Sequence, residues 1–175
     1  MEDEAKASAT IYRSAAAAGE LMDLYAESLA DWPVSVTEID VETSYGTVHV
    51  LESGPHDGRP LLLLHAASMA SISWAPNVAA LSDAGFRSFA IDYIGEAGKS
   101  RLAAVTTFPS SAREIGELYV EVADRLGVDT AAVVAASAGG HAALRFTLAA
   151  PERVTRLSLL GPMGITPLGV RAMLR

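Results

Sequence analysis

The stretch around Ser137 constrains the fold more than any other part of this 175-residue chain. An apolar run over residues 131–136 stops at this serine, small residues flank it on both sides, and a helix-compatible stretch follows over 138–149. This order predicts a strand, a sharp turn and a helix in immediate succession. Small residues are needed two positions before and two after the serine, because a larger side chain would strike the neighbouring strand or helix.

Strand and helix patterns alternate along the rest of the chain. Residues 36–41 and 47–52 alternate apolar with polar side chains around a turn at 44–46, which predicts an antiparallel hairpin. The continuously apolar run 61–64 predicts a strand that is covered on both faces. Strands that alternate with helices imply an α/β fold with a mostly parallel sheet. The remaining expected strands are 87–91, 131–136 and 154–160, and the expected helices are 3–30, 74–83, 111–126 and 138–149.

Composition excludes several classes of protein. Half of the residues are apolar, which is enough for the core of one folded domain. The net charge of -8 disfavours a nucleic-acid partner. The acidic first residues do not resemble a signal peptide, no apolar run reaches the roughly 18 residues of a membrane span, and no cysteine is present for a thiolate metal site. We therefore expect a cytoplasmic domain with no cofactor, no metal and no membrane partner.

Several motifs together resemble the α/β-hydrolase family. The run 61–64 followed by His65-Ala66-Ala67-Ser68 is similar to the family's strand and oxyanion loop, and residues 92–100 are similar to its D-x-x-G-x-x-G-x-S loop. Residues 135–139 match G-x-S-x-G with alanine in place of the first glycine. The resemblance implies an α/β-hydrolase fold that is incomplete at its C-terminal side. Its expected parts are an N-terminal helical extension (1–33), a partial hydrolase core (34–162) and the start of a cap or connecting segment (163–175).

The same resemblance assigns chemistry to three residues. It implies that Ser137 is the nucleophile and that the backbone N–H groups of Ala67 and Ala138 form the oxyanion hole. A serine hydroxyl also needs a base to take its proton, and the base needs a third group to orient it. In the family both come from later strands, and no aspartate follows Ser137 in this sequence. The chain is therefore expected to lack a complete triad.

Each histidine is expected to be non-catalytic. His141 lies four residues after the serine, along the following helix, so we expect it to be structural. His65 is expected to hold the backbone of the oxyanion loop through its ring. His49 and His56 lie in the hairpin and its exit turn, where surface positions are expected.

Two further residues carry structural expectations. Asp92 ends a strand, and its match to the first position of the D-x-x-G motif predicts a turn-forming role. Ala66 replaces the glycine that is usual in the oxyanion loop, so a positive φ angle is expected to strain it.

Two functions remain open from the sequence. In the first, the chain is the N-terminal part of a serine hydrolase that acts on carboxylic esters or similar small apolar substrates, and the isolated chain is inactive. A companion C-terminal fragment, or self-association, would then cover the exposed flank of the last strand. In the second, the chain is a catalytically silent α/β-hydrolase-like module for binding or assembly.

Overall fold

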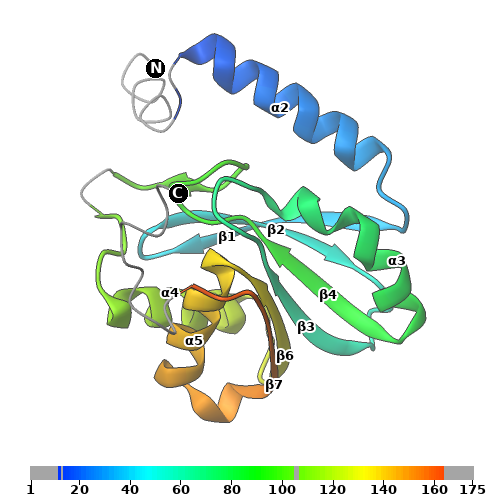
Figure 1. The fold of residues 1–175 in the computed structure, drawn as a ribbon, viewed down its shortest axis with the longest axis vertical. Helices are drawn as coiled ribbons and strands as arrows, with labels where there is room; N and C mark the ends of the chain where they lie inside the picture. Colours follow the sequence, from blue (N-terminus) through cyan, green and yellow to red (C-terminus); the bar gives the residue numbers. More distant parts are fainter. Residues whose placement is uncertain (1–11, 13, 105–106, 164–175) are drawn as a thin grey trace.

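A computed structural model of the protein describes residues 12, 14–104 and 107–163 (Figure 1). Residues 164–175, which were expected to begin a cap or connecting segment, lie outside this range. In chain order the elements are α2 (Ala15–Ala30), β1 (Val36–Thr43), β2 (Gly46–Ser53), β3 (Arg59–Leu64), the 3-10 helix η1 (Ser71–Trp74), α3 (Ala75–Asp83), β4 (Phe86–Ile91), β5 (Arg101–Leu102), α4 (Ala112–Arg125), β6 (Ala131–Ala136), α5 (Ala138–Ala149), the 3-10 helix η3 (Pro151–Arg153) and β7 (Val154–Leu160).

The strands form one mixed sheet in the order β1-β2-β4-β3-β6-β7, and the two-residue β5 pairs with β2. β1 and β2 make the antiparallel hairpin that the sequence predicts, with Val36 opposite Ser53 and Thr43 opposite Gly46. β2 runs antiparallel to β4, whereas β4, β3, β6 and β7 are parallel to one another. The mostly parallel sheet with an antiparallel N-terminal hairpin is therefore confirmed. Because β3, β4 and β6 are parallel neighbours, their carboxyl ends meet at one edge of the sheet.

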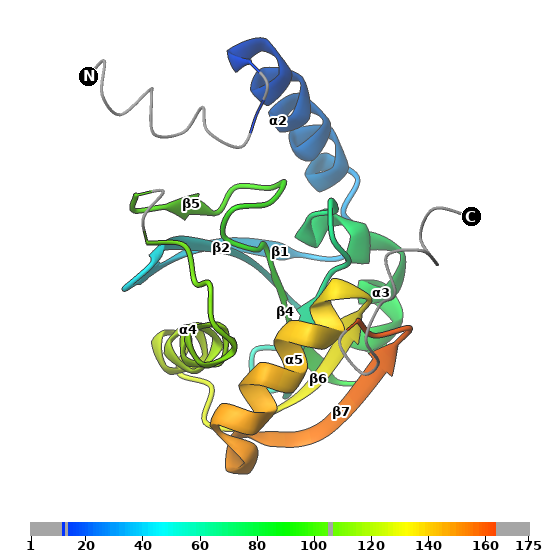
Figure 2. The same cartoon turned by 60° about the vertical axis from the view of Figure 1, so that its left-hand side comes forward.

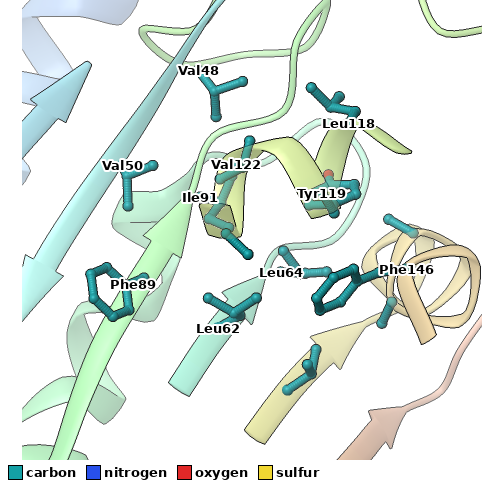
Figure 3. Close-up of a cluster of buried hydrophobic side chains, with 14 of the residues drawn as sticks. Val48, Val50, Leu62, Leu64, Phe89, Ile91, Leu118, Tyr119, Val122 and Phe146 are labelled. Carbon is teal, nitrogen blue, oxygen red and sulfur yellow. The ribbon is translucent and has the colours of Figure 1, made fainter. Parts of the chain in front are cut away.

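Apolar side chains are buried on both faces of this sheet. The residues of β3 alternate between the two faces, and this explains why its run of leucines is continuously apolar. Figure 2 shows α4 and α5 side by side on one face. The cluster on that face includes Val50, Leu62, Leu64, Phe89, Ile91, Tyr119, Val122 and Phe146 (Figure 3). The cluster on the opposite face includes Tyr25, Trp32, Leu51, Leu61, Leu63, Trp74, Val78 and Ala90.

The N-terminal helix α2 joins the second cluster through a single fully buried side chain, Tyr25. The helix begins after Ser14, whose hydroxyl accepts a hydrogen bond from the N–H of Ala17 at 3.1 Å. The predicted helix over 3–30 is confirmed from residue 15 onward, and residues 3–11 and 13 are outside the described range. In the described part of the chain, every helix is too short or too polar to cross a lipid bilayer.

His49 is buried, so the expected surface position is wrong for this residue. The residue is 4% exposed, and its ring and that of Tyr25 meet edge to face with centroids 6.1 Å apart. Nδ1 lies 2.7 Å from a carboxylate oxygen of Asp40, and Nε2 lies 3.0 Å from one of Glu38. The hairpin alternation could not reveal this, because the cover comes from α2 in the tertiary structure. His56 is exposed, as expected.

Candidate active site

Three loops leave the sheet next to one another at the carboxyl ends of β3, β4 and β6. Leu64, the last residue of β3, is paired with Ile91 of β4 on one side and with Ala135 of β6 on the other. The loop after β3 carries Ala67, the loop after β4 begins at Asp92, and the turn after β6 is Ser137 itself. The sheet therefore brings together the two segments that carry the predicted site residues, with Ala67 on one and Ser137 and Ala138 on the other, and the loop of Asp92 lies beside them.

Ser137 occupies a strained turn between β6 and α5. Its φ of 49° and ψ of -112° are rarely adopted by a residue with a side chain. Its N–H donates to the carbonyl of Leu160 at 3.0 Å, and its carbonyl accepts from the N–H of Met163 at 2.9 Å. These bonds to the end of β7 hold the strained backbone in place. Among the described residues, no histidine or other group makes a hydrogen bond with the half-buried Ser137 hydroxyl.

The small residues after the serine have the steric reason that the sequence indicated. A Cβ atom on Gly139 would lie 2.5 Å from the hydroxyl of Tyr93 and 2.7 Å from the carbonyl oxygen of His65, and still closer to that of Leu64. A Cβ atom on Gly140 would lie 2.5 Å from the side chain of Pro162. Glycine at 139 therefore lets helix α5 start directly against the end of β3, and glycine at 140 lets Pro162, just after β7, pack against the same turn of the helix.

The strain in the loop after β3 falls on Ser68 and not on Ala66, so the expected positive φ at Ala66 is wrong. Ser68 has a φ of 61°, and the N–H of Met69 donates to the carbonyl of Ala66 at 3.2 Å to close the turn. Since Ser68 takes the left-handed conformation, Ala66 does not need it. In the described part of the chain, Ser68 and Ser137 are the two non-glycine residues with positive φ, and each adjoins one predicted oxyanion donor.

Those predicted donors are the N–H groups of Ala67 and Ala138. Ala67 is exposed in the loop after β3, and Ala138 is the first residue of α5, where a backbone N–H has no partner within the helix. Within the described ranges neither N–H donates a hydrogen bond to the protein. Their assignment to an oxyanion hole stays a prediction.

His65 is a buried structural residue at the base of the loop after β3. Its ring stacks on Tyr93, with centroids 4.0 Å apart, and Nδ1 lies 2.8 Å from the carbonyl of Ala66. Nε2 accepts a hydrogen bond from the N–H of Tyr93 at 3.3 Å, so the proton resides on Nδ1. Burial lowers the pKa of His65, although the bond to Ala66 opposes the shift. Both ring nitrogens are occupied, and the ring is held neutral.

His141 has a structural role on α5. Its Nε2 accepts a hydrogen bond from the guanidinium of Arg145 at 3.4 Å. Burial and the positive charge of Arg145 both lower the pKa of His141. Neither histidine near the predicted nucleophile is thus arranged as its base.

Asp92 is fully buried and organises the loop after β4. One carboxylate oxygen accepts the N–H of Ser71 at 2.6 Å, and the other accepts the N–H of Lys99 at 2.8 Å and the hydroxyl of Tyr25 at 3.0 Å. Burial and the negative charge of Asp92 raise the pKa of the Tyr25 hydroxyl. Three hydrogen bonds replace the water that would otherwise solvate this buried carboxylate, which agrees with the structural role expected for it.

Sequence reasoning missed the role of Tyr25, because this residue was noted only as part of the predicted helix over 3–30. The available signal was the residue type, because a buried tyrosine usually finds a hydrogen-bond partner for its hydroxyl.

Among the described residues, no group of three or more histidine or carboxylate side chains is arranged to hold a metal ion.

Comparisons with known proteins agree with this architecture. The sequence profile of the alpha/beta hydrolase fold matches residues 59–173. The chain is 39% identical over 142 residues to the carboxylesterase YbfK of Bacillus subtilis, which covers 79% of this chain and 45% of that protein. It is 36% identical over 138 residues to the uncharacterized carboxylesterase nap of the same bacterium, covering 79% of this chain and 45% of that one.

A solved structure is similar over the same region. The crystal structure of carboxylesterase CesB (YbfK) from Bacillus subtilis superposes with a TM-score of 0.78 at 36% identity, over 83% of this chain and 50% of that one. The chain spans about half the length of the relatives it matches.

Proposed function

Because the chain belongs to the alpha/beta hydrolase fold family, we propose that it is the N-terminal part of a serine hydrolase that cleaves carboxylic esters or similar small apolar substrates. The observation that carries the proposal is the backbone of Ser137, which is held at a φ of 49° on the turn between β6 and α5. Strained residues persist where the surrounding structure holds them, often at functional sites. Similarity to two carboxylesterases supports ester cleavage.

In the proposed reaction, the Ser137 oxygen attacks the carbonyl carbon of the ester while a histidine takes its proton. The carbonyl oxygen becomes an oxyanion that accepts hydrogen bonds from the N–H groups of Ala67 and Ala138. Collapse of this intermediate breaks the bond to the alkoxy group, which leaves as the alcohol with the proton from the histidine. Water then attacks the carbonyl carbon of the acyl-serine while the histidine takes its proton, and the second oxyanion accepts from the same two N–H groups. Collapse breaks the bond to the Ser137 oxygen, which takes the proton back from the histidine, and releases the acid.

The base of this reaction is proposed to come from outside the 175 residues. His65 is bonded to Ala66 and Tyr93, and His141 is bonded to Arg145. The chain alone is then expected to have negligible turnover, because an unassisted serine hydroxyl is a poor nucleophile at neutral pH.

The companion segment that supplies the base is proposed to pair with the free edge of β7. In the described part of the chain, β7 pairs with β6 alone. An open edge strand offers unpaired backbone groups to a further strand. Without that segment, the same edge is expected to drive self-association of the chain.

Exposed apolar side chains at the strand ends support an apolar substrate and an apolar cover. Met69 lies in the loop after β3 and is 47% exposed, and Phe108, which is 49% exposed, packs its ring against Gly95 in the loop after β4. Leu160 is the last residue of β7 and is 55% exposed, and Met163, three residues later, is 38% exposed. Large apolar side chains at adjoining loops are typical of a binding surface.

The test uses a polypeptide in which the chain continues into a C-terminal half, either its own or that of a carboxylesterase relative. We expect this protein to hydrolyse a nitrophenyl ester and to be labelled by a fluorophosphonate at Ser137, while the chain alone does neither. Ser137→Ala should abolish both signals, and Ser110→Ala, at an exposed serine, should leave them unchanged.

Two outcomes contradict the proposal. Turnover that survives Ser137→Ala would place the nucleophile elsewhere. A completed, folded protein that neither hydrolyses esters nor reacts with the fluorophosphonate would favour the catalytically silent module.

A further inference from the structure

The carboxylate of Glu96 holds the exposed half of the oxyanion loop. Its Oε2 accepts a hydrogen bond from the N–H of Ser68 at 2.6 Å. Ser68 directly follows Ala67, whose N–H is a predicted oxyanion donor. Hydrogen bonds from backbone N–H groups to an ionised carboxylate are shorter and stronger than those between neutral groups.

This loop needs an external anchor beyond Ala66. The first half is tied down by the buried ring of His65, but Ala67, Ser68 and Met69 are all exposed. Ser68 also keeps a φ of 61°, which is unfavourable for a residue with a Cβ atom. Within the loop itself, the described bond is the one from Met69 to the carbonyl of Ala66, at 3.2 Å. The 2.6 Å bond to Glu96 is the contact that ties the strained residue to the rest of the protein.

Glu96 is itself mounted on a well-anchored loop. It lies four residues after Asp92, whose carboxylate is fixed by donors from Ser71, Lys99 and Tyr25. Glu96 is half-buried, and it comes from the loop after β4, whereas Ser68 comes from the loop after β3. The bond therefore couples two adjacent loops across the carboxyl edge of the sheet.

Resting on the proposed function, we infer that Glu96 is a positioning residue of the hydrolase site. It fixes the peptide unit between Ala67 and Ser68, which adjoins the unit that carries the Ala67 N–H, and so restricts where that N–H can lie, without touching the substrate. Oxyanion donors accelerate the reaction only when they are already placed where the negative charge develops. Misplacement by about 1 Å can lower a rate by about 10²-fold.

The experiment measures kcat and KM for a neutral nitrophenyl ester in the protein that includes the C-terminal half. Glu96→Ala should lower kcat by about 10- to 100-fold with KM within about twofold of the original, because the donor acts mainly in the transition state. Glu96→Gln should keep most of kcat, since its amide oxygen still accepts from Ser68. Glu117→Ala, on the exposed face of α4, serves as the matched control and should change neither constant.

A second-site change separates positioning from general damage. Adding Ser68→Gly to Glu96→Ala should restore part of kcat, because glycine adopts positive φ without steric cost. If Glu96→Ala does not fold, Glu96→Asp replaces it, and its shorter carboxylate should produce a similar loss of kcat.

Failure of this inference can be told apart from failure of the proposed function. If Ser137→Ala is inactive while Glu96→Ala keeps its kcat, or changes only in KM, the positioning role is refuted and the serine mechanism stands. If Ser137→Ala still turns over the ester, the proposed function is refuted and the role of Glu96 falls with it.

Discussion

Gly139 offers a sharp test of how closely α5 approaches the end of β3. Gly139→Ala adds one methyl group, which would lie 2.7 Å from the carbonyl oxygen of His65 and 2.5 Å from the hydroxyl of Tyr93. An unstrained contact between carbon and oxygen is about 3.3 Å or longer. The start of α5 would therefore have to move by about 0.6 Å to clear the carbonyl oxygen of His65, and it would have to move further to clear the Tyr93 hydroxyl and the Leu64 carbonyl oxygen. Because α5 and β3 are both buried and packed against other elements, neither backbone can move without displacing its neighbours.

The displacement should affect both stability and catalysis. Overpacking of this kind costs about 1–3 kcal/mol in the free energy of unfolding. Because α5 begins with Ala138, directly after Ser137, the same movement shifts the proposed nucleophile and one predicted oxyanion donor together. We expect kcat for ester hydrolysis to fall by about 10- to 100-fold, by the sensitivity of reaction rates to misplacement of the reacting groups.

The assay pairs urea unfolding, followed by tryptophan fluorescence, with ester hydrolysis in the completed protein. Gly19→Ala is the matched control, because a Cβ atom at Gly19 in α2 would meet nothing within 4 Å. That variant should gain about 0.5–1 kcal/mol, since alanine is the better helix former, and should keep its kcat. A Gly139→Ala protein with the original stability and turnover would refute the close approach of α5 to β3.

Three other perturbations have expected outcomes. Ser137→Gly should be inactive but more stable to urea by about 1 kcal/mol, because glycine accepts the strained φ and ψ angles, whereas Ser137→Ala should show no such gain. Tyr25→Phe removes a hydroxyl that donates to the buried carboxylate of Asp92 and should cost about 1.5–3 kcal/mol, while Tyr12→Phe, at a half-buried bond to a neutral carbonyl, should cost clearly less in the same titration. The pKa of His65 is lowered in the folded protein, so as the pH falls through about 6.5 this histidine becomes protonated in the unfolded chain before it does in the folded one. The free energy of unfolding should therefore decrease from pH 7.5 to 5.5. His65→Gln should flatten this decrease, and an unchanged pH slope would contradict the assignment.

Much of the fold could be predicted because its signals are local in the sequence. The strand over 131–136, the helix over 138–149 and the strand over 154–160 coincide with β6, α5 and β7. Each has a pattern of apolar and small residues within its own length. The two-residue β5 was not predicted, because so short a strand carries no periodicity of its own.

The failures concern residues whose surroundings come from distant parts of the chain. His49 alternates like a surface residue of a hairpin, yet Tyr25 of α2 covers it. Ala66 stands where glycine is usual, but the positive φ is taken by Ser68 and is supported by Glu96, 28 positions further along. No sequence pattern within either loop predicts the contact between Ser68 and Glu96.

The order of strands and helices and the sharp turn at Ser137 can be predicted from local patterns, because apolar periodicity and small side chains restrict the backbone within each segment. The groups that hold the candidate site come together only when the chain is folded. The parallel pairing of β3 with β4 and β6 brings three loop starts to one edge, and there a carboxylate from one loop can meet a backbone N–H of another. Such contacts depend on distances between strand ends, and these distances exist only once the sheet has assembled.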